Sequence, residues 1–214
     1  RALADFFSWF YNFTNCKRKY PKRIVKSIYL DDLNFNSVRD NLSGVPDRLK
    51  TRLRWYSGEG IDTAKPPVLE QKIRSGRLGK KNSIKILNLQ DKLGVTSFST
   101  IMRIIREEVP LDHFSSLEYL IPTLYVSYFR QYFEDGSGLR VTIDEDIKFK
   151  SHLLMDQCLD HGRYVPYSSK IVEFKFDPSL KDEVSDLIRS LKLTPLRHSK
   201  YLTGLAMSGQ AQYL

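Results

Sequence analysis

Apolar and polar residues alternate strictly over residues 48–55. One face of this extended stretch carries four cations, Arg48, Lys50, Arg52 and Arg54, and the other carries two leucines, a threonine and a tryptophan. A strand of this kind buries its apolar face and leaves like charges about 6.5–7 Å apart on the other face. Because such a row repels itself, it favours an anionic partner. The alternative is a solvated edge strand whose cations prevent aggregation.

Four other segments oppose an apolar face to a face with Lys or Arg: 68–74, 125–133, 139–143 and 171–176. Residues 24–30 predict a further short strand. Residues 134–138 (Glu-Asp-Gly-Ser-Gly) predict a hairpin turn, and the Gly- and Pro-rich residues 57–67 predict a long loop. If the sheet closes with its apolar faces outward under helices, its charged faces line a tunnel.

Helical spacing of apolar residues predicts helices over residues 2–13, 37–42, 87–110, 112–120, 182–191 and 199–207. Ser97 or Ser99 is the expected cap within the longest, and Pro110 its stop. The aromatic first helix is expected to dock on the core; an interfacial membrane helix beside the basic residues 17–26 is the alternative. We therefore predict an α+β fold, an antiparallel β-barrel with a basic interior, covered by helices.

The composition of the chain limits the kinds of molecule that it is expected to bind. The net charge of +9 implies a polyanion: nucleic acid, an anionic membrane surface or a phosphate-rich small molecule. The 214 residues suit one domain, 1–214, and Cys16 and Cys158 are expected as free thiols in a reducing compartment. We expect neither a spanning helix nor a signal peptide. The expected location is cytoplasmic, with the cytosolic face of a membrane as an alternative, reached through other domains or subunits.

Several charged segments lie outside the alternating strands. The five cations of residues 17–23 predict a basic loop, either solvated or a mouth that attracts polyanions. Arg77, Lys80 and Lys81 predict a second basic loop, which is expected to become ordered on a ligand. Residues 144–146 are predicted as surface charge; a metal role for Asp144, which shares the parity of Arg140, is the alternative. The spacing of the four histidines does not favour zinc, and no P-loop, dinucleotide fingerprint or Ser-His-Asp set stands out.

Seven short motifs follow one another between about residues 24 and 205: Ser27-Ile-Tyr-Leu-Asp-Asp32, Arg48-Leu-Lys-Thr-Arg-Leu-Arg-Trp-Tyr56, Leu69-Glu-Gln-Lys72, Tyr128-Phe-Arg130, Leu139-Arg-Val-Thr-Ile-Asp144, Val172-Glu-Phe-Lys175 and Ser199-Lys-Tyr-Leu202. In order and spacing they resemble the VTC domain. This is the polyphosphate-polymerase domain of vacuolar transporter chaperone proteins and their bacterial relatives, in the superfamily of triphosphate tunnel metalloenzymes, or CYTH proteins.

The resemblance implies a phosphotransferase. A nucleoside triphosphate such as ATP enters the tunnel, and its γ-phosphoryl passes to a growing polyphosphate chain with Mn²⁺ or Mg²⁺. The residues that it implies for holding phosphates are Arg52, Arg54, Lys72, Arg130, Arg140, Lys175 and Lys200. Lys50 joins them because it shares their inward parity. Glu173, by motif and parity, and Glu70, by parity, are the expected metal ligands; Glu70 pairing with a lysine is the alternative.

In one respect the sequence differs from the pattern of the tunnel enzymes, and the difference affects the prediction of catalysis. Tunnel enzymes open with a strand of roughly Tyr-Glu-x-Lys, and nothing before Tyr29 matches it. That strand is expected either to precede residue 1 or to be lost, and its loss would open the barrel. The alternative function is thus a non-catalytic sensor of polyphosphate, inositol phosphates or another polyanion. Carboxylates among the cations favour the enzyme, and nucleic acid is not expected because the strand aromatics fall mostly on the core side.

Overall fold

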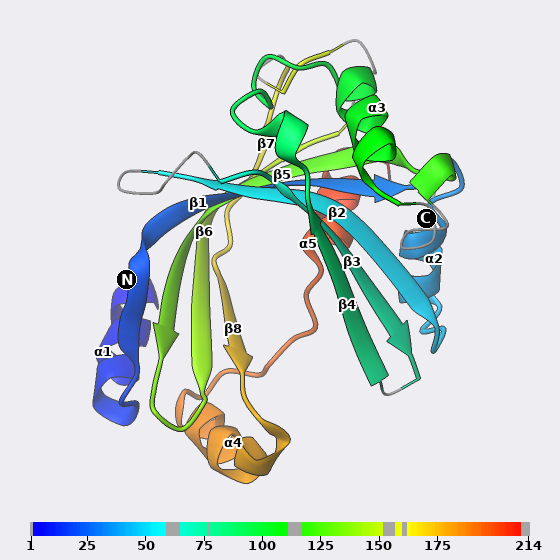
Figure 1. The fold of residues 1–214 in the computed structure, drawn as a ribbon. Coiled ribbons are helices and arrows are strands. Elements are labelled where there is room, and N and C mark those ends of the chain that lie inside the picture. Colours follow the sequence, from blue (N-terminus) through cyan, green and yellow to red (C-terminus); the bar gives the residue numbers. More distant parts are fainter. Residues whose placement is uncertain are drawn as a thin grey trace.

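The computed structural model describes residues 2–58, 65–76, 78–110, 117–151, 157–159 and 162–210. Its centre is an eight-stranded antiparallel sheet of order β4-β3-β2-β1-β5-β6-β7, with β8 also paired to β6. The sheet is bent into an arch, with β3 and β4 on one side and β6 and β8 on the other (Figure 1). The strands are β1 (Lys17–Asp31), β2 (Arg48–Ser57), β3 (Val68–Ser75), β4 (Leu78–Lys85), β5 (Ile121–Glu134), β6 (Arg140–Lys150), β7 (Val165–Tyr167) and β8 (Ile171–Lys175).

The α+β class and the antiparallel sheet are confirmed, but closure into a barrel is not observed. Within the described residues, no pairing joins the edge strand β4 to β7 or β8. The β4 edge carries Lys80, Lys81 and Lys85, and charged side chains of this kind discourage pairing with another strand. The concave side of the arch is therefore a groove between two sheet edges.

Three predictions about charged segments were wrong. Residues 17–23 are not a loop, because they begin β1, which pairs with β5 from Lys17 onward. Lys80 and Lys81 belong to β4, which pairs with β3 along its whole length. The polar composition of β4 gives no apolar alternation from which a strand could be predicted. Arg77 lies outside the described residues. Residues 144–146 are not surface charge as a group, because β6 continues through them and buries Asp144.

The helices are α1 (Ala2–Phe13), α2 (Asn36–Leu42), α3 (Phe98–Glu108), α4 (Lys181–Ser190) and α5 (Lys200–Met207), with 3₁₀ turns at Leu87–Leu89, Leu117–Tyr119 and Pro178–Leu180. The helix predicted over 87–110 was too long. The chain turns after the first 3₁₀ segment, and α3 begins only after Ser97, whose hydroxyl accepts a hydrogen bond from the Thr100 amide. Of the helix predicted over 112–120, residues 112–116 lie outside the described part and the rest is mainly a 3₁₀ turn.

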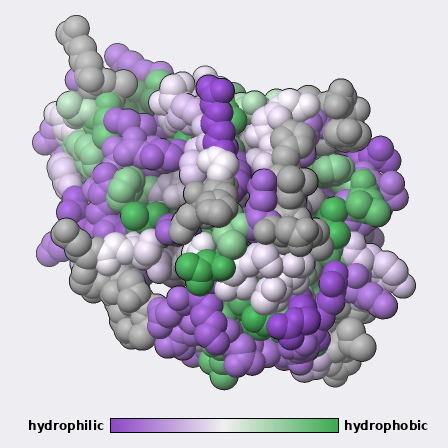
Figure 2. Space-filling model, turned by 90° about the horizontal axis from the view of Figure 1, so that it is seen from above, coloured by the Kyte–Doolittle hydropathy of each residue, from purple (hydrophilic) through white to green (hydrophobic). Residues whose placement is uncertain are grey.

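The convex face of the sheet packs on α3, α1 and α4. Ile28, Leu30 and Leu53 meet the buried side of α3, while residues of β5 and β6 meet α1 and α4. The docking of α1 on the core is confirmed, since Phe6 and Phe10 are buried. Seen from above, on the α3 side, hydrophobic residues form separate small patches among hydrophilic ones (Figure 2). Among the described residues no helix is long and apolar enough to cross a bilayer.

Helix α5 packs on the concave face. Tyr201 and Leu205 join a buried cluster with β1, β5 and β6, and the Tyr201 hydroxyl donates to the Asp31 carboxylate at 2.8 Å. The contact requires glycine at position 204, because a Cβ there would lie 2.5 Å from Leu124 Cδ2 and 2.6 Å from Phe149 Cδ1. This close approach brings the start of α5, with Lys200, into the groove.

Candidate functional site

The concave face holds a cavity of about 560 Å³ between β1, β2, β3, β4, β5, β8 and the start of α5. Its described lining includes nine lysines and arginines but only two glutamates, Glu70 and Glu173. The cations are Lys50, Arg52, Arg54, Lys72, Lys80, Lys81, Arg130, Lys175 and Lys200. Alternation along β2 and β3 accounts for part of this gathering, because opposite residues of paired strands share a face: Arg52 lies opposite Glu70, and Lys50 opposite Lys72.

Every predicted phosphate-holding residue except Arg140 lines the cavity, and so do both predicted metal ligands. Arg140 is exposed at the start of β6, opposite Lys175, outside the cavity. Whether these residues bind phosphate or metal stays a prediction. Sequence reasoning missed Tyr29 and Tyr128, although Tyr128 shares the parity of Arg130. It also missed Lys81, because β4 shows no clear alternation.

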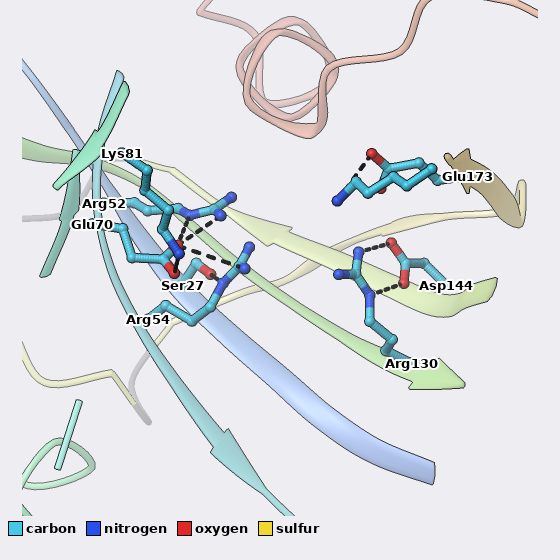
Figure 3. A network of polar contacts seen from close by, with 9 residues as sticks. Ser27, Arg52, Arg54, Glu70, Lys81, Arg130, Asp144 and Glu173 are labelled. Atoms are coloured by element: carbon cyan, nitrogen blue, oxygen red, sulfur yellow. Dashed lines mark hydrogen bonds and ion pairs between the residues drawn. The ribbon is translucent and has the colours of Figure 1, made fainter. Parts of the chain in front are cut away.

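Glu70 organises the cations on one side of the cavity (Figure 3). Its carboxylate accepts from Arg52 Nε at 2.8 Å and from Lys81 Nζ at 2.6 Å, and lies 3.6 Å from Arg54 Nη1. Burial by itself would raise the pKa of Glu70, but the three cations outweigh it and hold the pKa at about 2. Glu70 is therefore ionised at neutral pH, and both of its oxygens are engaged by cations.

A second ion-pair group lies across the groove, where Arg130 of β5 meets Asp144 of β6 (Figure 3). Lys200, from the start of α5, completes it. Arg130 grips Asp144 through two parallel bonds of 2.6 and 2.7 Å, and Lys200 Nζ lies 2.6 Å from the same carboxylate. Asp144 is 1% exposed. Burial opposes its charge, but Arg130 and Lys200 lower the pKa of Asp144 below its ordinary value. Asp144 therefore holds the side chains of Arg130 and Lys200 in place. It is neither a surface charge nor a carboxylate that is open to a metal, because it is buried and both of its oxygens are engaged.

The cations around β2 exceed the charge that these carboxylates supply. Lys50 has no ion pair within the described residues; its Nζ donates to Ser199 Oγ at 3.3 Å, and burial lowers its pKa. Burial by itself would raise the pKa of the Tyr29 phenol. The positive charges of Arg52, Lys50 and other nearby cations outweigh burial, so the pKa of Tyr29 is lowered. A lowered phenol pKa indicates that the electrostatic potential in the cavity is strongly positive. Such a cavity favours the binding of anionic oxygens.

Glu173 differs from the other two carboxylates. Its side chain is 44% exposed, and its ion pair in the described structure is with Lys175 Nζ, at 3.4 Å. It therefore keeps room for another partner, whereas the oxygens of Glu70 and Asp144 are taken. No group of three or more His, Cys, Asp or Glu suited to a metal occurs among the described residues. Among the described lining residues, Glu173 therefore offers a hard cation one accessible carboxylate.

Residues 10–208 match the family model of the VTC domain. No curated protein sequence matches the chain.

One solved structure shares the fold at low sequence identity, and two others align with lower TM-scores. The adenylyl cyclase candidate HpAC1 from Hippeastrum, which has a dominant triphosphatase activity, aligns with a TM-score of 0.50 at 13% identity, over 97% of this chain and 89% of that one. An adenylate cyclase candidate from Vibrio parahaemolyticus aligns with a TM-score of 0.49 at 10% identity, over 94% and 90%. The PH1819 protein from Pyrococcus horikoshii aligns at 0.46 and 14%, over 97% and 93%.

The family model covers most of the chain, and it includes the strands and the helix start that supply the cavity's cations. The likeness to the Hippeastrum protein concerns the fold alone, which is CYTH-like. This chain therefore belongs to the VTC-domain family, within the triphosphate tunnel fold.

Proposed function

We propose that this domain binds a nucleoside triphosphate such as ATP in the concave cavity and transfers the γ-phosphoryl to a growing polyphosphate chain. The observation that supports it is the set of nine cations that converge there from strands on both sides of the arch and from α5. A chain of phosphates carries closely spaced negative charge, and a site that excludes water from it must supply cations in fixed positions.

The ion pairs supply that fixed geometry. Glu70 orients Arg52 and Lys81, and Asp144 orients Arg130, so these side chains lose little freedom when a ligand binds. Phosphoryl transfer asks little covalent chemistry of a protein and depends on alignment and charge stabilisation. In this proposal the planar guanidinium groups of Arg52, Arg54 and Arg130 grip phosphate oxygens, while Lys72, Lys175 and Lys200 add charge around them.

The fold family implies a divalent cation, Mn²⁺ or Mg²⁺, and Glu173 would hold it. Such an ion would supply positive charge that stabilises the transferring phosphoryl group. Glu173 lies on β8, two residues from Lys175, so it could hold the ion close to a phosphate that this lysine contacts. Glu70 is the weaker metal ligand of the two predicted, because arginine and lysine occupy its oxygens.

A second candidate is a module that binds polyphosphate, inositol phosphates or another polyanion without reacting. The engagement of Glu70 and Asp144 by cations favours it, since this leaves one carboxylate of the described lining open to a metal. The two candidates share a ligand and differ in turnover.

The decisive experiment incubates the protein with ATP and Mn²⁺ and measures polyphosphate and free phosphate, with tripolyphosphate binding measured by calorimetry on the same sample. Polyphosphate formation supports the polymerase. Release of phosphate alone indicates a triphosphatase and contradicts the polymerase. Binding without turnover supports the non-catalytic module, and absence of binding contradicts both candidates.

A further inference from the structure

A bulge in the first part of β1 places two side chains on the concave face. Tyr20 lies opposite Tyr132 and Arg23 opposite Arg130, so three steps along β1 match two along β5. Strict alternation would put Tyr20 and Arg23 on different faces. The bulge, which includes Pro21, puts both beside the concave residues of β5. Bulges of this kind often re-aim side chains at functional sites.

Arg23 lies among three tyrosine rings, and its side chain has no hydrogen-bond acceptor within the described residues. Its guanidinium carbon is 4.0 Å from the ring centre of Tyr20, 5.0 Å from that of Tyr132 and 5.6 Å from that of Tyr56. Its Nε is buried without a hydrogen-bond partner, and its side chain forms no ion pair within the described residues. The rings hold the guanidinium by cation–π contacts, but they leave a buried donor unsatisfied, which is costly.

A second buried polar group that lacks a described partner lies next to Tyr132 on the concave face, on β6. Thr142 lies opposite both Tyr132 and Glu173, so it shares their face. It is 8% exposed, and its hydroxyl has no hydrogen-bond partner in the part of the chain that the structure describes. Two residues further along β6, the exposed Arg140 lies opposite Lys175. From Asp144 to Arg140 this strip extends about 13 Å along the strand. The helices on β5 and β6 here, α1 and α4, cover the other face.

We propose that Arg23, in its cage of Tyr20, Tyr56 and Tyr132, is the centre of an outer subsite for the phosphates of a linear polyphosphate that extend beyond the main cavity. The inference rests on the proposed function and adds a determinant of chain length to it. A phosphate oxygen supplies the acceptor that Arg23 lacks, and the rings present the planar guanidinium in a fixed orientation. Arg140 and Thr142 then line the continuing path.

The test compares tripolyphosphate with a long-chain polyphosphate by calorimetry, using wild type, Arg23→Gln, Arg23→Lys and Lys26→Gln. The control loses the same charge from the same strand, but Lys26 follows Val25 and precedes Ser27, so it lies on the opposite face. Arg23→Gln should weaken binding of the long chain about tenfold, as expected for charge-assisted hydrogen bonds. Tripolyphosphate binding should change less than about twofold, and Lys26→Gln should not distinguish the two ligands.

Arg23→Lys keeps the charge and loses the planar fork, so it should show the same selective weakening to a smaller extent; it carries the test if Arg23→Gln does not fold. Equal weakening of both ligands, or unchanged binding of the long chain, would overturn the outer subsite while leaving the proposed function intact. If wild type binds neither polyphosphate, the proposed function fails and the subsite with it.

Discussion

Replacing Glu70 by Gln removes the negative charge around which Arg52, Arg54 and Lys81 are grouped. The pKa of Glu70 is about 2 in the folded protein against an ordinary value of 4.5. A difference of this size corresponds to about 3 kcal/mol of stability at pH 7. We therefore expect Glu70→Gln to lower the free energy of unfolding by about that amount at neutral pH, because the three cations then lose their counter-charge.

The loss should depend on pH in a defined direction. Because folding depresses the pKa of Glu70, its contribution is complete above about pH 5 and disappears as the pH falls towards 2. The gap between wild type and Glu70→Gln should shrink to about 2.5 kcal/mol at pH 4 and about 1.4 kcal/mol at pH 3. Urea unfolding of both proteins at these pH values measures it. As a control, Glu107→Gln breaks an exposed ion pair with Arg103 and should cost less than about 0.5 kcal/mol.

The affinity for an anionic ligand should rise in Glu70→Gln, although the stability of this variant falls. Tripolyphosphate brings negative charge to the same cations, so it should bind Glu70→Gln more tightly and raise its melting temperature more than that of wild type. The reasoning is refuted if the two proteins are equally stable at pH 7, or if their difference is the same at pH 7 and pH 3. Unchanged stability with loss of metal-dependent turnover would instead assign Glu70 to the metal.

Three further outcomes are expected. Glu173→Gln should abolish metal-dependent turnover while tripolyphosphate still binds, with equal or higher affinity because a repulsive charge is gone; unchanged turnover, with the exposed Glu118→Gln as control, contradicts its assignment to the metal. Tripolyphosphate binding measured by calorimetry should weaken steeply from low to high salt, and salt-independent binding would argue against a site made of charges. Gly204→Ala should lower stability in urea by about 1–3 kcal/mol because its Cβ meets Leu124 and Phe149, whereas Gly136→Ala, which has open space, should change little.

Local sequence patterns were enough to predict the two faces of β2 and the start of α5. Alternation over residues 48–55 correctly placed Lys50, Arg52 and Arg54 together and Leu53 in the core, because neighbouring side chains of any strand point to opposite faces. It likewise indicated the start of α5 at Ser199, whose hydroxyl accepts from the Leu202 amide. Both features are local, so a few consecutive residues suffice to predict them.

Pairing and burial were decided only in the tertiary structure. Asp144 read as surface charge because nothing near it in the chain shows that Arg130 and Lys200 enclose it. The bulge that puts Tyr20 and Arg23 on one face depends on the register between β1 and β5, and no local pattern encodes that register. Lys81 reached the cavity only because β4 pairs with β3. In each case the partner comes from another strand or helix, so the side chain's surroundings depend on packing that alternation cannot express.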